Sequence, residues 1–232
     1  IQVDALTKNY GMTVGVRNLN FHVDRGEVLG FLGPNGAGKT TTIRTLMDEI
    51  RPTAGSATIV GLDTHRDSVE IRKHIGYIPG DLAMYPNLTG KDTLTYFSNL
   101  RGGVDWAYVN TLAARLEADL AKKIGDLSTG NRQKVGLIAA LASGAELLIL
   151  DEPMSGLDPR ARVLFKQQLA KLKQQGVTVF FSSHVLADVE EIADNMAVLH
   201  NSSIYFSGAP AEFKDKYQSD SVEMAYMRCI EE

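Results

Sequence analysis

The hydrophobic and polar positions near the amino terminus alternate in the manner of β-strands. In residues 16–23 apolar side chains recur between polar ones, and the alternation shifts by one residue between Val16 and Leu19. This pattern is typical of a half-buried antiparallel strand. The next run, residues 27–33, is almost wholly apolar and ends in glycine. It predicts a strand that is buried on both faces.

Further short apolar runs alternate with helical stretches along the rest of the chain. A helical pattern begins at Gly38, places its apolar residues on one face and stops at Arg51-Pro52. The remaining strand-like runs cover residues 57–61, 74–79, 147–153 and 177–183. Alternating strands and helices indicate an α/β fold with a mostly parallel sheet flanked by helices. The antiparallel pattern at the amino terminus adds a β subdomain to this core.

Residues 81–126 interrupt the alternation. They contain no strand-like run, their apolar residues fall at helical spacings, and Gly102 and Gly103 separate two expected helices. We therefore expect a helical lobe inserted into one domain that spans residues 1–232. The expected division is residues 1–80 and 127–218 for the core with its β subdomain, 81–126 for the lobe and 219–232 for a C-terminal tail.

Composition and charge narrow the possible partners. The formal net charge of −4 argues against nonspecific binding to nucleic acid. The single cysteine, Cys229, can form neither an internal disulfide nor a cysteine metal cluster. The most apolar run, residues 135–150, is too short to span a bilayer and contains Glu146. The opening residues lack the basic and apolar regions of a signal peptide. We expect no nucleic acid partner and no direct membrane insertion.

The stretch GPNGAGKT, residues 33–40, matches the phosphate-binding loop G-x-x-x-x-G-K-[ST]. It follows a predicted buried strand and precedes a predicted helix, which is the context that this motif requires. Its glycines let backbone amides point at phosphates, and the helix start adds its positive end. Lys39 would meet the outer phosphates, and the Thr40 hydroxyl would bind Mg²⁺. The candidate phosphate-binding residues are Gly33, Pro34, Asn35, Gly36, Ala37, Gly38, Lys39, Thr40 and Thr41.

Two carboxylates and a histidine follow neighbouring apolar runs. Asp151 and Glu152 end the run LLILDEP, and His184 ends the run that includes VTVFFSS. Ligands bind at the carboxyl ends of the strands in α/β sheets, so we expect all three beside the phosphate loop. Asp151 is suited to hold Mg²⁺, Glu152 to accept a proton from an attacking water, and His184 to contact the γ-phosphate.

The stretch LSTGNRQKV, residues 127–135, starts another helical pattern with an unusual first turn. Ser128 is a suitable N-cap, and Thr129 and Gly130 present exposed amides. If Ser128 is the N-cap, Asn131 occupies the position where Glu or Gln would complete a capping box. Asn131 is one methylene shorter than Gln, so we expect the reciprocal cap to be weak. The stretch serves as a helix cap and is also suited to bind a phosphate.

These elements, in this order, resemble the nucleotide-binding subunit of ATP-binding-cassette (ABC) transporters over roughly residues 3 to 210. The resemblance implies that Tyr10 stacks on the adenine and that Ser128, Thr129 and Gly130 stand in the family's signature segment. It implies that Asp158, in SGLD, reaches across a dimer interface. ATP and Mg²⁺ are the implied cofactors, and the implied catalytic residues are Glu152, His184 and Lys39.

The family resemblance also implies partners. Two copies, or this chain and a paralogous ATPase subunit, would pair head to tail around two Mg-ATP molecules, each signature closing the other subunit's site. Closure would drive a separate transmembrane permease, and the chain would lie peripherally at the cytoplasmic face of the membrane. The segment IGYIPGDLAMYPNLTG is similar to that of the exporter branch.

Position 80 departs from the family. The family commonly has Gln there, which reaches Mg²⁺ and the attacking water, whereas this chain has Gly80 followed by Asp81. Either a water takes the place of the amide or Asp81 swings in. This departure keeps open a nucleotide-gated clamp that does not hydrolyse ATP. Two further functions explain less of the sequence. Ribosome- or DNA-directed family members usually carry two cassettes or a long coiled coil, and a simple phosphate-loop kinase leaves LSTGN and SGLD unexplained.

Overall fold

The computed structural model describes residues 1–231, and its strands form two sheets. The larger sheet has the strand order β10-β9-β3-β8-β7-β6. Its neighbouring strands are parallel except for the antiparallel pair β9 and β10, which confirms the predicted fold class. Its strands are β3 (Val28–Leu32), β6 (Ile75–Ile78), β7 (Leu147–Leu150), β8 (Thr178–Ser183), β9 (Asn195–His200) and β10 (Ser203–Gly208).

The central strands are buried on both faces, as their unbroken apolar runs predict. Every residue of β3, β7 and β8 is buried. Along β7, Leu148 and Leu150 join one hydrophobic cluster, and Leu147 and Ile149 join the other. Because successive side chains of a strand point to opposite faces, the sheet separates two cores and carries its functional side chains only where the strands end.

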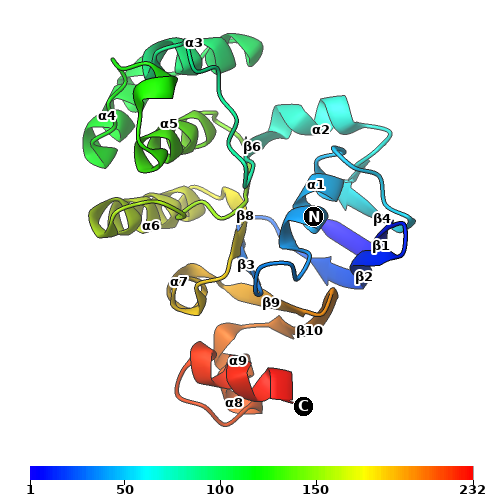
Figure 1. The fold of residues 1–232 in the computed structure, drawn as a ribbon. Coiled ribbons are helices and arrows are strands. Elements are labelled where there is room, and N and C mark those ends of the chain that lie inside the picture. The colour runs from blue at the N-terminus through cyan, green and yellow to red at the C-terminus, as the bar shows by residue number, and fades with distance from the viewer. Residues whose placement is uncertain (232) are drawn as a thin grey trace.

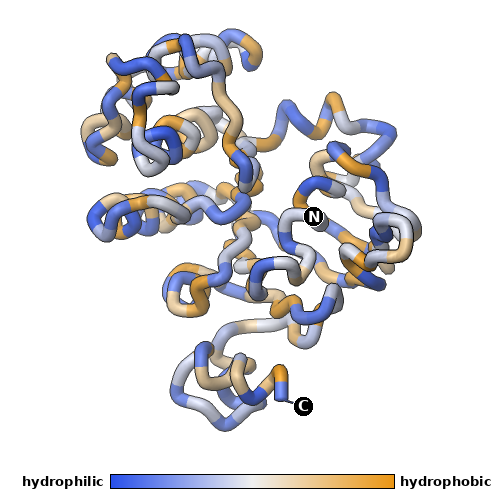
Figure 2. Tube along the Cα trace, in the orientation of Figure 1, coloured by the Kyte–Doolittle hydropathy of each residue, from blue (hydrophilic) through white to orange (hydrophobic). Residues whose placement is uncertain are grey.

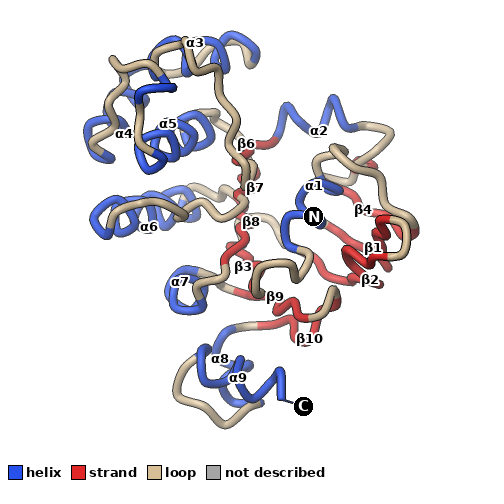
Figure 3. The backbone as a smooth tube through the Cα atoms, in the orientation of Figure 1, coloured by secondary structure: helices blue, strands red, loops and turns tan. Residues whose placement is uncertain are grey.

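The layers on the two sides of this sheet differ. Figures 1 and 3 show the large sheet as a column through the centre, with helices α3 to α7 on one side and α1, α2 and the small sheet on the other. Helices α6 (Pro159–Gln174) and α7 (Leu186–Ile192) pack against central strands, α2 (Ser68–His74) packs against β6, and α1 (Lys39–Leu46) packs against β2 and β4 of the small sheet.

The small sheet is antiparallel throughout, with the order β2-β1-β4-β5. The slip in alternation at Leu19 corresponds to a shift in register between β1 and β2, where Asn18 has a φ of 48°. A bulge of this kind re-aims the residues beyond it, so Leu19 remains fully buried. The strands are β1 (Gln2–Tyr10), β2 (Thr13–His22), β4 (Ala54–Ile59) and β5 (Leu62–Asp63).

The segment 81–126 is helical, as predicted. It contains α3 (Gly90–Leu100), α4 (Trp106–Leu116) and the short 3₁₀ helix η1 (Ile124–Asp126), and Gly102 and Gly103 lie between the first two. The following helix, α5 (Thr129–Leu141), packs against α3 and α4 and also against β6. The helix that starts with the signature residues therefore joins the lobe to the sheet.

The helix after the phosphate loop is shorter than its apolar pattern suggests. We predicted helix until Arg51-Pro52, but α1 ends at Leu46. Asp48 adopts a left-handed φ of 54°, and the amides of Glu49 and Ile50 both donate to the Arg44 carbonyl. These bonds satisfy the last turn of the helix without extending it.

The C-terminal residues form two helices after β10, and the second of them packs against the first and against α7. They form α8 (Pro210–Lys216) and α9 (Val222–Glu231), and Cys229 on α9 is 1% exposed. Within residues 1–231 no helix has the length and apolar character that crossing a membrane requires. Figure 2 agrees, because hydrophilic and hydrophobic residues are mixed along the helices.

Candidate functional site

The phosphate loop lies between the end of β3 and the start of α1. Gly36 and Gly38 have φ values of 83° and 111°, which residues with a side chain rarely adopt. A Cβ at Gly38 would also lie 2.4 Å from Val16 Cγ1 on β2. Glycine is therefore required where the loop becomes helix. The amino-terminal end of α1 opens onto this loop, which is the arrangement that binds phosphate in other folds.

Lys39 is the first residue of α1, and only 5% of it is exposed. Its Nζ donates to the carbonyl oxygens of Gly33 at 2.7 Å and Pro34 at 3.2 Å. The same Nζ lies 3.2 Å from Glu152 Oε1. In the chain alone the loop carbonyls and this carboxylate satisfy the ammonium group. A phosphate that binds in the loop has to take over these contacts, and its charge makes it a strong acceptor.

Asp151 directly follows β7 and is 1% exposed. Its Oδ1 accepts a hydrogen bond from Ser182 Oγ at 2.5 Å. Its Oδ2 is buried and, among residues 1–231, has no hydrogen-bond partner. An unpaired buried oxygen costs free energy, so this atom is poised to take a ligand. Mg²⁺ is bound through one or two carboxylates together with substrate phosphates, and the Asp151 carboxylate fits that role.

The second oxygen ligand expected from the sequence is the hydroxyl of Thr40. Thr40 is exposed in the first turn of α1. No group of three or more His, Cys, Asp or Glu side chains within the described residues 1–231 forms a cage for a metal ion. Mg²⁺ needs no such cage, because waters and substrate oxygens complete its octahedron. Asp151 and Thr40 thus fit a site that nucleotide completes.

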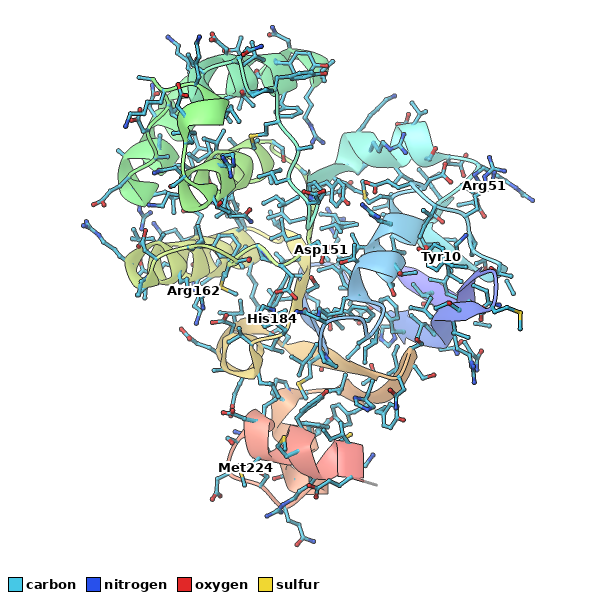
Figure 4. All side chains as sticks on the ribbon, viewed as in Figure 1. Tyr10, Arg51, Asp151, Arg162, His184 and Met224 are labelled. Atoms are coloured by element: carbon cyan, nitrogen blue, oxygen red, sulfur yellow. The ribbon has the colours of Figure 1, made fainter. Side chains whose placement is uncertain are left out.

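Glu152 and His184 meet beside Lys39. Glu152 has the left-handed φ of 49°, which is uncommon for a residue with a side chain. Its Oε2 lies 2.8 Å from Nδ1 of His184, which follows β8 and whose side chain is 49% exposed. A contact of this length between an imidazole nitrogen and a carboxylate oxygen joins the two side chains directly. Figure 4 shows His184 and Asp151 near the centre of the molecule.

Tyr10 lies at the end of β1, next to the start of α1. A Cβ built on Gly15 would lie 2.8 Å from Tyr10 Cε2 and 3.2 Å from Thr41 Cγ2. The missing side chain at Gly15 therefore lets the Tyr10 ring approach α1. Lys8 Nζ lies 5.2 Å from the ring centroid, and 47% of Tyr10 is exposed. The structure thus places an accessible aromatic surface beside the phosphate loop.

The signature residues form the predicted cap. Ser128 is the N-cap of α5, and its Oγ accepts from the Asn131 amide at 3.3 Å. Asn131 Nδ2 also donates to this oxygen at 3.3 Å, and Asn131 Oδ1 is buried without a partner among residues 1–231. The Asn131 side chain thus does not return a bond to the Ser128 amide.

Gly130 has a second reason to lack a side chain. A Cβ at this position would lie 2.6 Å from the carbonyl oxygen of Gly156. The start of α5 therefore packs directly against the SGLD loop. Gln133 strengthens this contact, because its Nε2 donates to the Pro153 carbonyl at 3.0 Å. The signature helix and the loop that follows the two carboxylates are held together as one unit.

Both carboxylate oxygens of Asp158 have partners within its own chain. It is the N-cap of α6, where its Oδ1 accepts from the Ala161 amide at 2.8 Å. Its Oδ2 lies 3.0 Å from Nζ of the buried Lys134. The hydrogen bond from Ala161, followed by the one from Lys134, lowers the pKa of Asp158 below its ordinary value. Any role across a dimer interface would therefore start from a fixed carboxylate.

The two groups of predicted site residues lie apart in one chain. Figure 1 shows α5 on the opposite side of the large sheet from α1. Among the described residues, no hydrogen bond or ion pair joins residues 128–130 to residues 33–40. The structure brings the phosphate loop together with Asp151, Glu152 and His184, and it leaves the signature facing elsewhere.

Comparison with known proteins decides the family. Residues 16–155 match the family model described as ABC transporter. The chain belongs to the ABC transporter family. This result confirms the resemblance that the motifs carry.

Relatives in the ABC transporter family cover most of the chain. The bacitracin transport ATP-binding protein BcrA of Enterococcus faecalis is 38% identical over 203 residues, 86% of this chain and 66% of that protein. The ABC transporter ATP-binding protein NatA of Bacillus subtilis is 31% identical over 223 residues, 91% of this chain and 89% of NatA. The chain therefore spans about two thirds of BcrA and most of NatA.

Solved structures share the fold. One ATP-binding subunit of an ABC transporter is 27% identical, with a TM-score of 0.90 and coverage of 99% of this chain and 98% of that one. A dimeric ATP-binding cassette in a post-hydrolysis state with ADP and Pi has a TM-score of 0.81 at 22% identity, covering 90% of this chain and 97% of that one. The latter likeness concerns the fold alone.

The glutamine that is usual in the ABC family at position 80 would require the Asp151 side chain to shift. A Cβ on Gly80 would lie 2.7 Å from Asp151 Oδ2 and 3.1 Å from its Cγ. Any side chain there would displace the Asp151 carboxylate, so the observed position of Asp151 depends on a glycine at position 80. Asp81 follows with its side chain exposed.

The motifs did not indicate several contacts within the site of this ABC family member. Ser182 bridges Asp151 and Glu152, Gly156 packs on Gly130, and Lys134 pairs with Asp158. A serine at the end of an otherwise apolar strand was a usable signal for Ser182. The other two contacts join segments more than twenty residues apart, so no local sequence pattern indicates them.

Proposed function

We propose that this chain is the ATP-binding subunit of an ABC transporter, and that it hydrolyses Mg-ATP to ADP and phosphate. The observation that carries this proposal is the meeting of the phosphate loop with Asp151, Glu152 and His184 at one edge of the sheet. Structural glycine turns do not need a buried lysine, an unpaired buried carboxylate oxygen and a histidine in contact with a second carboxylate.

Each residue has a role in this proposal. The loop amides and Lys39 bind the outer phosphates and stabilise the charge on the transferred group. Asp151 and Thr40 hold Mg²⁺, which neutralises phosphate charge when it is bound. Glu152 accepts a proton from the attacking water. His184 orients Glu152 and contacts the γ-phosphate, and Tyr10 stacks on the adenine.

The signature residues complete the site of a second subunit. Residues 128–130 present the free amides of a helix start, yet they face away from the phosphate loop of their own chain. A head-to-tail pair, with this chain or a paralogue as partner, places each signature on the other subunit's ATP.

We further propose that this pair drives a transmembrane permease at the cytoplasmic face of the membrane. The permease is a separate polypeptide and exports its cargo. Two relatives support this proposal by their names. BcrA serves bacitracin transport, and YbhF of Escherichia coli, 32% identical over 240 residues, is a probable multidrug ABC transporter protein of which the chain covers 41%.

Affinity capture of the tagged chain from its native membranes tests the permease proposal. Recovery of a polytopic membrane protein supports it. Recovery of ribosomes or DNA in place of a membrane protein contradicts it.

The hydrolysis proposal is tested with the purified chain. We expect Mg-dependent release of phosphate from ATP by the wild type and its loss in Lys39→Ala, because the outer phosphates lose their charged partner. Lys171→Ala, which alters an exposed lysine on α6, is the matched control and should retain wild-type activity. Phosphate release that Lys39→Ala leaves unchanged would contradict the proposed site.

A clamp that binds Mg-ATP without hydrolysing it is the second candidate, and Gly80 favours it. The glutamine that commonly reaches the attacking water is replaced by a residue with no side chain. The same assay separates the two candidates. Binding of a fluorescent ATP analogue without phosphate release from ATP indicates the clamp, and multiple turnovers indicate the ATPase.

A further inference from the structure

Ser182 occupies a position that neither the motifs nor the family match assigns to the site. It lies near the end of β8, is fully buried, and follows Phe181, which pairs in register with Leu150 on β7. Continuing this parallel register sets Ser182 beside Asp151. The strand order therefore brings one hydroxyl group to the point where β7 ends and the two carboxylates begin.

The hydroxyl of Ser182 uses both of its hydrogen-bonding capacities on the carboxylate segment. It donates to Asp151 Oδ1 at 2.5 Å and accepts from the backbone N–H of Glu152 at 2.9 Å. A hydroxyl has one donor hydrogen and two acceptor lone pairs, so a single group can make both bonds. Alanine can make neither, and cysteine makes both only weakly.

One of these two bonds fixes the Asp151 carboxylate, and the other fixes the backbone of Glu152. The bond to Oδ1 fixes the Asp151 carboxylate and leaves Oδ2 as its unpaired buried oxygen. The bond from the Glu152 amide holds a residue whose φ of 49° is unfavourable for a side chain. In that conformation the Glu152 carboxylate reaches both Lys39 and His184.

We propose that Ser182 is a positioning residue, which orients Asp151 toward the magnesium ion and holds Glu152 in its left-handed conformation. This inference rests on the proposed binding of Mg-ATP. Groups that orient metal ligands typically change metal affinity or activity by roughly 10- to 100-fold when they are removed. Ser182 acts through the two carboxylates and touches no nucleotide in this role.

The test measures magnesium binding apart from hydrolysis. A fluorescent ATP analogue is titrated into the full chain at a series of Mg²⁺ concentrations. We expect Ser182→Ala to bind the analogue like the wild type without Mg²⁺ and to need roughly 10-fold more Mg²⁺ for half of the magnesium-dependent change. Ser182→Thr keeps the hydroxyl and should restore much of the wild-type response.

Thr178→Val is the matched control. Thr178 starts the same strand, is 7% exposed, and its Oγ1 accepts from the Gly26 amide at 2.9 Å. The substitution deletes a buried hydroxyl at the opposite end of the strand from the carboxylates, so the magnesium response should not change. If Ser182→Ala does not fold, Ser182→Cys replaces it, because the thiol fills the space and hydrogen-bonds weakly.

The outcomes separate this inference from the proposed function. A wild-type chain that binds no nucleotide, with or without Mg²⁺, contradicts the proposed function itself. A wild type with a magnesium response that folded Ser182→Ala or Ser182→Cys reproduces contradicts the role of Ser182 alone. An equal shift in Thr178→Val also overturns the inference, because a general loss of packing then explains the effect.

Discussion

The phosphate-loop region and the signature region are both suited to bind phosphate, but they differ in how far their polar groups find partners within the chain. Around the loop, charges are paired inside the chain: Lys39 contacts Glu152, and Glu152 contacts His184. At the start of α5, Ser128 and Thr129 are exposed, and the first amides of the helix have no intrahelical partner. The charged groups of the first region have partners within the chain, whereas in the proposed head-to-tail pair the second region gains its partner from the other subunit.

Glu152→Gln should have the largest effect, because it removes the proposed base and one charge of the paired network. We expect turnover to fall by roughly 10²- to 10⁴-fold, while ATP still binds and an ATP-bound dimer accumulates. Phosphate release and size-exclusion chromatography with ATP measure the two effects. Glu146→Gln, just before the other end of β7, is the control. Substantial hydrolysis by Glu152→Gln would remove Glu152 from this role.

Gly130→Ala probes the opposite region through its packing. The new Cβ would lie 2.6 Å from the Gly156 carbonyl oxygen, and overpacking of this kind typically costs about 1–3 kcal/mol of unfolding free energy. Denaturant unfolding measures the loss. The neighbouring Thr129→Ala, at an exposed position, should change stability by less than about 0.5 kcal/mol. Equal stability of both variants and the wild type would contradict the close packing of α5 against the SGLD loop.

Asp158→Asn tests whether the SGLD loop is held by charge. The pKa of Asp158 is lowered in the folded chain by the Ala161 amide and Lys134, so its charge stabilises the fold above the unfolded pKa of about 3.9. This contribution is lost as pH falls through the lower, folded pKa. We expect the stability difference between wild type and Asp158→Asn, measured by denaturant unfolding, to be present at pH 6 and to shrink in acid. A difference that is constant with pH contradicts this account.

Asn131→Gln should have the smallest effect and the opposite sign. The longer side chain can reach the Ser128 amide and complete the capping box, which should raise the unfolding free energy by roughly a few tenths of a kcal/mol, at the low end of cap effects. Thermal unfolding measures this gain. A less stable variant would show that the Asn131 side chain makes a local contribution which Gln cannot replace.

Local patterns predicted those parts of the molecule that depend on residues close in the chain. Repeating hydrophobic spacing and short motifs indicated the parallel core, the inserted helices and the phosphate loop for this reason. The slip in alternation at Leu19 marks the position where the register shifts. The early end of α1 was missed because it depends on a left-handed Asp48 and not on hydrophobic spacing.

What remained hidden depends on contacts between distant segments. No local pattern pairs Ser182 with Asp151 or Gly130 with Gly156, since strand order and loop packing bring them together. The C-terminal residues were also uninformative as a sequence. Their helix α9 is recognisable only once Val222, Ala225 and Cys229 are seen to be buried.

The burial of Cys229 has a practical consequence for spectroscopy. It is the only cysteine of the chain and is 1% exposed, so thiol-directed labels should react with it slowly. A cysteine introduced at the exposed Thr129 or at the hairpin residue Met12 would then be the one readily labelled thiol. Labels for distance measurements can therefore be attached to introduced cysteines on both halves of the molecule while Cys229 is kept.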